Sequence, residues 1–156
     1  MPDPLLAELG LYKEIERARK IARRYGAAVS AQEQFVFLET KDSAGRNILA
    51  RIDCTGYPNQ PLNAEFLDPQ KGPEADAQAS HNPEHWPKNP RPMERDNRFY
   101  LCLAGTKSYL RFHKDPGFVM PLPDLVRTLI LWCRGQSHLL RLGPAAGVRA
   151  QRGRGG

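Results

Sequence analysis

Apolar residues recur three or four positions apart between Pro4 and Tyr25, a spacing that predicts an amphipathic helix. Pro4 suits the first helical turn, and Gly26 is a natural stop. Lys and Arg residues occupy the other faces and gather toward the end of this segment. A solvated face that complements the helix dipole explains them, and a docking surface for an acidic partner is the functional alternative. The apolar positions of the predicted helix are Leu5, Leu9, Tyr12, Ile15 and Ile21.

After this helix the apolar spacing changes to alternation, which is typical of strands. The predicted strands cover residues 34–40, 47–54 and 62–67. A polar turn at 41–47 joins the first two strands into a hairpin, and Cys54 at its end is interpreted as a packing residue. In the segment 56–62, Pro58 and Pro61 fix an extended bend before the third strand. A helix followed by an antiparallel meander indicates the α+β class.

The second half of the chain alternates irregular stretches with two regular segments. Residues 71–98 are polar and proline-rich and are predicted to form a long loop, with Trp86 folding back to anchor it. A short extended piece follows and ends at Gly105, where the chain must turn. A second irregular stretch then leads into a helix at 123–134 that is apolar over most of its circumference and must be buried. One more turn is expected at 137–142.

Length and composition indicate one globular domain. The chain has 156 residues, of which 40% are hydrophobic and 26% charged, as in ordinary soluble proteins. We expect the domain to cover 4–142 and a disordered basic tail of Gly and Arg to cover 143–156. The first residues lack a basic leader, and no apolar run reaches the roughly 18 residues that cross a bilayer. Three widely spaced cysteines argue against a disulfide scaffold or a zinc site and favour the cytoplasm.

The net charge of +6 does not by itself predict nucleic-acid binding. The excess of Lys and Arg lies partly in the C-terminal tail, where a weak contact with nucleic acid or an acidic partner is possible in principle. Aromatic residues are not interleaved with the basic ones, as a surface that binds single strands would require. We therefore do not expect nucleic acid or a membrane among the partners.

Cys102 is the residue around which a reaction can be built. It lies in a short apolar run, with Arg95 and Arg98 before it and Lys107 after it. Cationic neighbours favour the thiolate form of a cysteine, which is the nucleophile. The alternative interpretation of Cys102 is a small buried hydrophobe, the usual role of a free cysteine.

The order of these features resembles the ubiquitin-conjugating enzyme fold over nearly all of the predicted domain. Residues 57–61, Tyr-Pro-Asn-Gln-Pro, resemble the Tyr-Pro-x-x-Pro-Pro signature of that family, with Leu62 in place of the second proline. Residues 101–103, Leu-Cys-Leu, resemble its Ile-Cys-Leu, and 122–133 resembles the helix that follows. The resemblance implies an N-terminal helix, an antiparallel β-meander, an active-site loop and a buried C-terminal helix.

The chain departs from this family before the cysteine. The family carries His-Pro-Asn shortly before its cysteine, with the Asn supporting the oxyanion. Here the chain has His81-Asn82-Pro83 and, closer to the cysteine, His85-Trp86-Pro87. The tryptophan usual after the cysteine is missing, and a longer segment with His113 takes its place. This pattern resembles bacterial members found in antiphage conjugation systems such as CBASS, in which a cGAS-like nucleotidyltransferase or a ubiquitin-like protein is conjugated.

The resemblance implies a thioester mechanism on Cys102. The thiolate would take a C-terminal glycyl group from an activating enzyme and pass it to a lysine of a target protein. His85 and His113 are the candidates for proton acceptor or oxyanion donor, and Asn82 or Asn97 could replace the missing Asn. The sequence has no Gly-x-x-x-x-Gly-Lys loop and no set of metal ligands, so we expect no cofactor and assign ATP to the partner.

Two other classes of function remain open for the same residues. Cys102 with a histidine could form a cysteine-hydrolase pair, although no third polar partner is evident. The same fold could also serve as a catalytically inactive binding module in which the cysteine is buried or unused. Fast alkylation of Cys102 alone among the three cysteines would separate the enzyme from the binding module.

Overall fold

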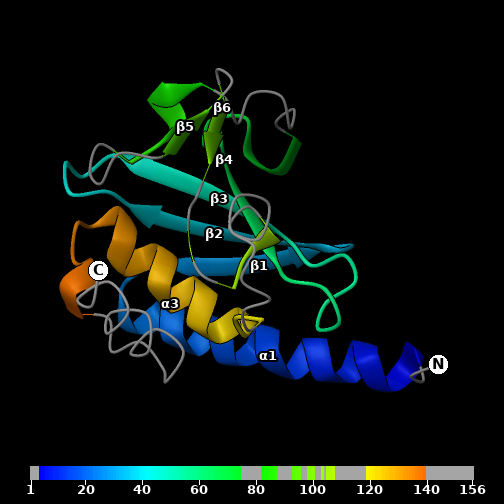
Figure 1. Cartoon of the computed structure of the whole chain (residues 1–156). Coiled ribbons are helices and arrows are strands. Elements are labelled where there is room, and N and C mark those ends of the chain that lie inside the picture. Colours follow the sequence, from blue (N-terminus) through cyan, green and yellow to red (C-terminus); the bar gives the residue numbers. More distant parts are fainter. Residues whose placement is uncertain are drawn as a thin grey trace, which may run out of the picture.

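The computed structural model describes residues 4–74, 82–87, 93–95, 98–100, 103, 105–107 and 119–139. Helix α3 lies across one face of a four-stranded antiparallel sheet, and helix α1 lies beside α3 next to strand β1 (Figure 1). The strands follow one another across the sheet in chain order. The principal elements are α1 (Pro4–Arg24), β1 (Ala28–Gln32), β2 (Phe35–Lys41), β3 (Asn47–Asp53), β4 (Asn63–Leu67) and α3 (Leu122–Cys133). The predicted α+β class is confirmed.

Helix α1 packs through small side chains. Ala18 and Ala22 are fully buried, and both belong to the core cluster that α1 shares with α3 and the sheet. Because an alanine adds little bulk, the two helix backbones can approach closely. The helix ends before Gly26, whose φ of 70° is the left-handed conformation that glycine adopts without a steric penalty. The bounds of the helix predicted over Pro4 to Tyr25 are confirmed to within one residue, but Tyr12, predicted as one of its apolar positions, is 60% exposed.

The helix-facing side of the sheet shows the alternation read from the sequence. Leu38 of β2 lies opposite Ala50 of β3, which lies opposite Phe66 of β4, and all three are fully buried. Their side chains point to the same face because strand residues two apart share a face. The three predicted strands are therefore confirmed, with bounds shifted by at most one residue.

Strand β1 is absent from the predicted elements and is a correction to them. Its sequence, Ala-Val-Ser-Ala-Gln, contains one apolar β-branched residue, and only Val29 is buried. It pairs with β2 over its whole length. On the α1 side of the strand, the Arg19 Nε donates a hydrogen bond to the Val29 carbonyl oxygen at 3.3 Å. An edge strand of this kind exists because its neighbour offers hydrogen-bond partners, and it leaves little pattern in the sequence.

The opposite face of the sheet carries a small second apolar cluster. Phe37, Leu49 and Leu67 are each at most 4% exposed, and Phe35 packs against them. Arg51 lies over the Phe35 ring at 4.7 Å from its centroid and pairs with Glu65 across β3 and β4 at 2.6 Å. This cluster explains why the sheet strands have apolar residues on both faces.

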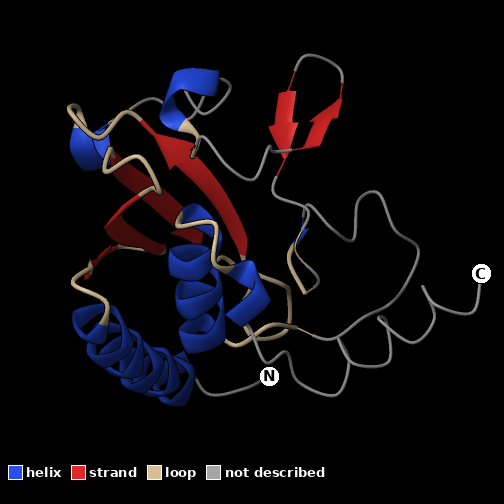
Figure 2. Ribbon diagram, turned by 90° about the vertical axis from the view of Figure 1, so that its left-hand side faces the viewer, coloured by secondary structure: helices blue, strands red, loops and turns tan. Residues whose placement is uncertain are grey.

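The long predicted loop contains more regular structure than its sequence suggests. The structure has a hairpin of β5 and β6, with Met93 opposite Tyr100, as a two-stranded sheet separate from the main one (Figure 2). Strands of three residues are too short to leave an alternation, so the assignment of 71–98 as irregular misses β5, whereas β6 falls in the extended piece predicted after that loop. The elements of this region are η1 (Gly72–Glu74), η3 (Pro83–His85), β5 (Met93–Arg95) and β6 (Arg98–Tyr100).

Helix α3 is the most buried element described. Its apolar side chains face α1, the sheet and Trp86, so nearly its whole circumference is covered. The predicted helix at 123–134 is confirmed, and the short helix η4 (Ser137–Leu139) falls within the extra turn predicted after it. Within the described ranges, neither helix has the length and apolarity that crossing a bilayer requires. The predicted tail at 143–156 lies outside the described residues.

Candidate functional site

The predicted site residues fall into two groups. Asn82 and His85 belong to the described segment 82–87. Cys102 and His113, together with the alternative Asn97, lie outside the described residues, so their roles stay predictions. The described neighbours of Cys102 in the sequence are strand β6 before it and residues 103 and 105–107 after it.

The other two cysteines are structural. Cys54 is 6% exposed and Cys133 is fully buried, and both are free thiols. Burial, helped by the charges of Asp53 and Glu14, raises the pKa of Cys54 to about 12. Burial also raises the pKa of Cys133 far above its ordinary value. A thiol in such a site is almost never a thiolate at neutral pH, so neither cysteine can serve as a nucleophile. The interpretation of Cys54 as a packing residue is confirmed.

The chain just after Cys102 is fixed to the end of the proline-containing bend. Thr106 forms a parallel bridge with Leu62, and the Lys107 N–H donates to the Leu62 carbonyl oxygen at 2.9 Å. The Thr106 hydroxyl donates to the Leu103 carbonyl oxygen at 2.7 Å. Gly105 has a φ of 84°, so the turn predicted there is confirmed. These contacts hold residues 105–107 beside the start of β4.

Tyr57, in the same bend, joins both helices. The peptide bond between Tyr57 and Pro58 is cis. The Tyr57 hydroxyl donates to Glu14 Oε1 of α1 at 2.5 Å and accepts from the backbone N–H of Leu122, at the start of α3, at 3.2 Å. Burial and the hydrogen bond to Glu14 raise the pKa of the Tyr57 hydroxyl. The bend therefore connects α1, α3 and the segment that follows Cys102.

The segment 82–87 is anchored by its tryptophan. Trp86 is 3% exposed, with its ring centroid 4.7 Å from that of Phe66 and 6.4 Å from that of Trp132. Phe66 and Trp132 also stack on each other, with centroids 5.8 Å apart. Aromatic groups at these separations attract one another beyond the burial of their surface. The prediction that Trp86 folds back and anchors the loop is confirmed.

Asn82 and His85 lie in one tight turn. The Asn82 Oδ1 accepts from the Glu84 N–H at 3.0 Å, and the Asn82 carbonyl oxygen accepts from the His85 N–H at 3.1 Å. The His85 Nε2 lies 3.9 Å from Asp68 Oδ2, and the two side chains are 15% and 23% exposed. The Asn82 carboxamide oxygen thus shapes the turn that presents His85. A carboxylate beside a histidine ring can orient the ring.

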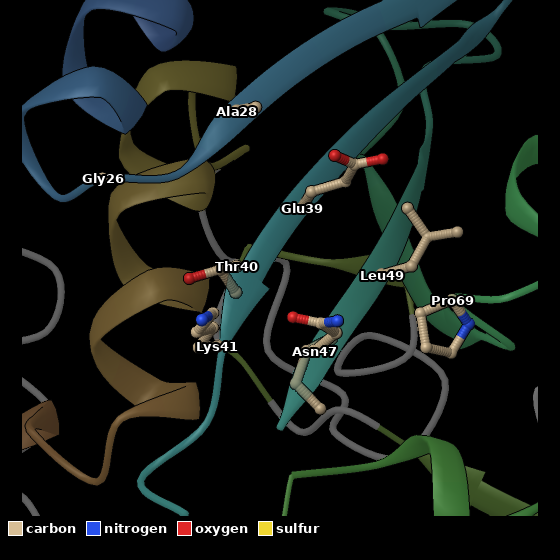
Figure 3. A pocket seen from close by; sticks show the side chains of 9 residues that line it. Gly26, Ala28, Glu39, Thr40, Lys41, Asn47, Leu49 and Pro69 are labelled. Atoms are coloured by element: carbon tan, nitrogen blue, oxygen red, sulfur yellow. The ribbon is translucent and has the colours of Figure 1, made fainter. Parts of the chain in front are cut away.

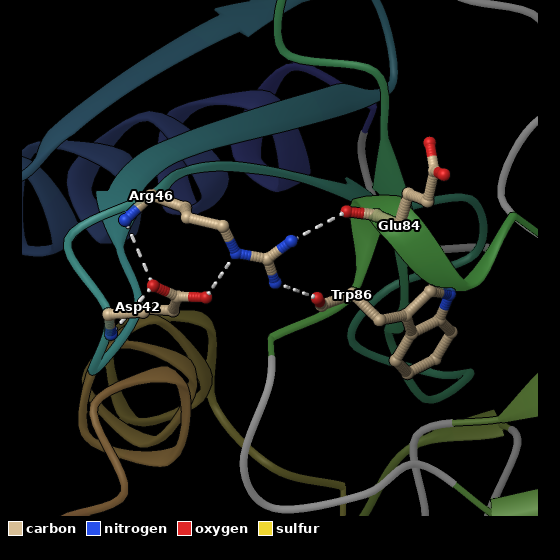
Figure 4. A network of polar contacts seen from close by, with 5 residues as sticks. Asp42, Arg46, Glu84 and Trp86 are labelled. Atoms are coloured by element: carbon tan, nitrogen blue, oxygen red, sulfur yellow. Dashed lines mark hydrogen bonds and ion pairs between the residues drawn. The ribbon is translucent and has the colours of Figure 1, made fainter.

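Arg46, from the turn between β2 and β3, binds the backbone of the segment 82–87 (Figure 4). Its Nη1 donates to the Glu84 carbonyl oxygen at 3.2 Å, and its Nη2 donates to the Trp86 carbonyl oxygen at 2.8 Å. Its Nε donates to the buried carboxylate of Asp42 at 2.9 Å. Arg46, Asp42 and Asp68 were not among the predicted site residues. The sequence does show that Asp42 and Arg46 lie four positions apart in a glycine-containing turn, a spacing at which the two side chains can pair. Nothing in the sequence indicates that Arg46 also contacts the segment 82–87.

A hollow on the sheet is separate from these residues. It has a volume of about 310 Å³ and lies near the end of β2 and the start of β3. Figure 3 shows side chains from β2 and β3 with Pro69 beside them, and none of the predicted site residues lines it. Groups of three or more His, Cys, Asp or Glu side chains that could hold a metal ion do not occur in the described part of the chain. The lining residues are Gly26, Ala28, Glu39, Thr40, Lys41, Asn47, Ile48, Leu49 and Pro69.

Comparisons of the chain with protein-family models, with curated proteins and with solved structures find no match.

Proposed function

We propose that the protein is a ubiquitin-conjugating-like transferase that works through a thioester on Cys102. The cargo is the C-terminus of a ubiquitin-like protein or of a cGAS-like nucleotidyltransferase, and the acceptor is a lysine of a target protein. The setting we propose is the cytoplasm of a bacterium, in antiphage defence. An activating enzyme supplies the cargo and consumes the ATP.

The observation that carries this proposal is the attachment of the chain after Cys102 to the Tyr-Pro-x-x-Pro bend. The Leu62–Thr106 bridge and the Lys107 hydrogen bond join the end of this bend to residues four and five positions after Cys102. Tyr57 in the same bend joins the N-terminal helix to the helix that follows the cysteine. The order of helix, antiparallel meander, bend and buried helix supports the same assignment. The burial of Cys54 and Cys133 supports the choice of Cys102 as the proposed nucleophile.

The reaction has two balanced steps. In the first, the Cys102 thiolate attacks the carbonyl carbon of the activating enzyme's thioester, a new C–S bond forms, and the partner's thiolate leaves. In the second, a neutral lysine amine attacks the same carbon, a C–N bond forms, and the Cys102 thiolate leaves. The amine loses a proton in this step. His85, which lies 3.9 Å from the Asp68 carboxylate, is the described candidate to accept it.

The test is intact-mass spectrometry of the chain mixed with ATP and the proteins encoded next to it. We expect a covalent adduct on the wild type that a thiol reductant removes and that Cys102→Ala does not form. Cys54→Ala is the matched control and should form the adduct, because Cys54 is buried. An adduct that persists in Cys102→Ala would refute the site. No adduct in the presence of an active activating enzyme would favour the inactive binding module.

A further inference from the structure

We propose that Arg46 is a positioning residue that fixes the orientation of His85. For the lysine-transfer step this inference rests on the proposed function. The structural part of it, that Arg46 determines where His85 lies, does not. His85 sits in a loop, and a group that exchanges a proton needs a defined position. Arg46 comes from a distant turn of the sheet and supplies that position.

The guanidinium binds the backbone on both sides of His85. The residue before His85 and the residue after it each offer a carbonyl oxygen to one guanidinium nitrogen, at 3.2 Å for Glu84 and 2.8 Å for Trp86. The peptide unit before His85 and the peptide unit between Trp86 and Pro87 are therefore tied to one rigid, planar group. Hydrogen bonds from a charged donor are stronger than those between neutral groups. Rotation of the His85 backbone would break at least one of them.

Asp42 keeps the guanidinium in place. Its side chain is fully buried, and its Oδ2 accepts from Arg46 Nε at 2.9 Å. Its Oδ1 accepts from the backbone N–H groups of Ala44 and Arg46, both at 2.9 Å. The carboxylate is thus fixed by the turn itself, and its charge is offset by Arg46. Because a buried charge without its partner is costly, the arginine is held where the carboxylate lies.

Other contacts complete the placement of His85. Trp86 is buried against Phe66, so the residue after His85 cannot swing outward. The imidazole Nε2 faces Asp68 Oδ2 at 3.9 Å, which gives the ring a charged neighbour at the end of β4. The backbone restraint from Arg46 and the nearby Asp68 carboxylate together favour one orientation of the ring. This is the rigid support that a proton-transferring group requires.

A lysine at position 46 could not replace the arginine. The three contacts of Arg46 use three separate nitrogens in one plane, directed at a carboxylate and two carbonyl oxygens. A lysine carries a single ammonium group on a flexible stem. It could retain the ion pair with Asp42 but not both carbonyl contacts. Arg46→Lys therefore separates the charge of the residue from its geometry.

The structural readout is hydrogen exchange at the Glu84, His85 and Trp86 amides, together with the NMR resonance of the His85 ring. We expect Arg46→Gln and Arg46→Lys to raise exchange about tenfold or more and to shift the ring resonance. Arg51→Gln is the matched control, because Arg51 also has an ion pair in the sheet, with Glu65, and lies over the Phe35 ring rather than at segment 82–87. Should Arg46→Gln fail to fold, Arg46→Lys retains a charge beside Asp42 and keeps the comparison open. Unchanged exchange and an unchanged ring resonance in a folded Arg46 variant would overturn the proposal.

The functional readout separates positioning from general stability. Discharge of the Cys102 thioester to free lysine should slow about tenfold or more in Arg46→Gln, whereas loading of Cys102 should be unchanged. In a His85→Ala background the same Arg46 substitution should have no further effect, because Arg46 acts through His85. An equal loss in both backgrounds would show a merely structural role and overturn the proposal. If the wild type forms no thioester, the proposed function fails, and exchange and the ring resonance alone decide the placement of His85.

Discussion

Native alkylation of the three cysteines is the sharpest prediction, because two of them are placed by the structure. Iodoacetamide reacts with thiolates, and the rate follows the thiolate fraction and the access of the reagent. Burial raises the pKa of Cys54 from 9.0 to about 12. Each rise of one pKa unit lowers the thiolate population about tenfold. Near pH 8 the thiolate population of folded Cys54 is therefore about 1,000-fold below that of an exposed cysteine. Cys133 is fully buried, and its pKa is raised further.

The assay follows intact mass against time in native buffer for the wild type, Cys102→Ala and Cys54→Ala. We expect the wild type and Cys54→Ala to gain one label rapidly and Cys102→Ala to gain none over the same interval. Unfolding in urea removes the protection, so all three cysteines of the wild type should then react. The denatured sample shows that the reagent is active and that protection comes from the fold.

Two results would refute different parts of the reasoning. If Cys102→Ala is labelled in native buffer at a rate within about tenfold of a free thiol, the argument from burial of Cys54 and Cys133 is wrong. If the native wild type gains no label, the burial argument stands, but Cys102 is a buried hydrophobe and the proposed transferase loses its nucleophile.

Three further predictions concern stability. The free energy of unfolding should fall above about pH 9, because the unfolded Cys54 thiol loses its proton there while folded Cys54 keeps its proton up to about pH 12. Cys54 contributes about 1.4 kcal/mol per pH unit to this fall, and Cys54→Ala should make a plot of Tm against pH less steep without flattening it, because the pKa values of Cys133 and Tyr57 are raised as well. Trp86→Ala should lower the free energy of unfolding in urea by about 3–5 kcal/mol, because the buried ring packs on Phe66. The control Tyr12→Ala should have little effect, because Tyr12 is 60% exposed. Tyr57→Phe should lower the free energy of unfolding by about 1–3 kcal/mol, because the Leu122 N–H loses its hydrogen-bond acceptor. An unchanged Tm in the control Tyr12→Phe would assign the loss to this contact.

The proposed function and the positioning by Arg46 make separate demands on the molecule. The transferase requires an accessible Cys102, which the adduct and alkylation experiments measure directly. The positioning by Arg46 requires that the conformation of the turn at 82–87 depend on contacts with the turn between β2 and β3. Hydrogen exchange and the His85 ring resonance measure this dependence. One can fail while the other holds, so the two proposals are tested independently.

Local pattern alone determined the helices and three of the four main strands. Helical spacing and glycine stops define α1 and α3, and alternation defines β2, β3 and β4. The same local signals predicted the turn at Gly105 and the burial of Trp86, because a positive φ favours glycine and a large aromatic side chain avoids water. Edge strand β1 and the three-residue strand β5 were not predicted, since pairing rather than local sequence stabilises them.

Only the tertiary structure decided which distant residues meet. Arg46 lies nearly forty positions from the carbonyl groups that it binds, and Leu62 lies more than forty from its bridge partner Thr106. The sequence of a polar turn does not indicate which distant loop its charged residue will contact. The sequence therefore names the residue types of the proposed thioester site. The contacts that hold His85 arise instead from the packing of two turns around the Phe66, Trp86 and Trp132 cluster. Periodicity is a property of neighbouring residues, but contact across the fold depends on how whole elements pack.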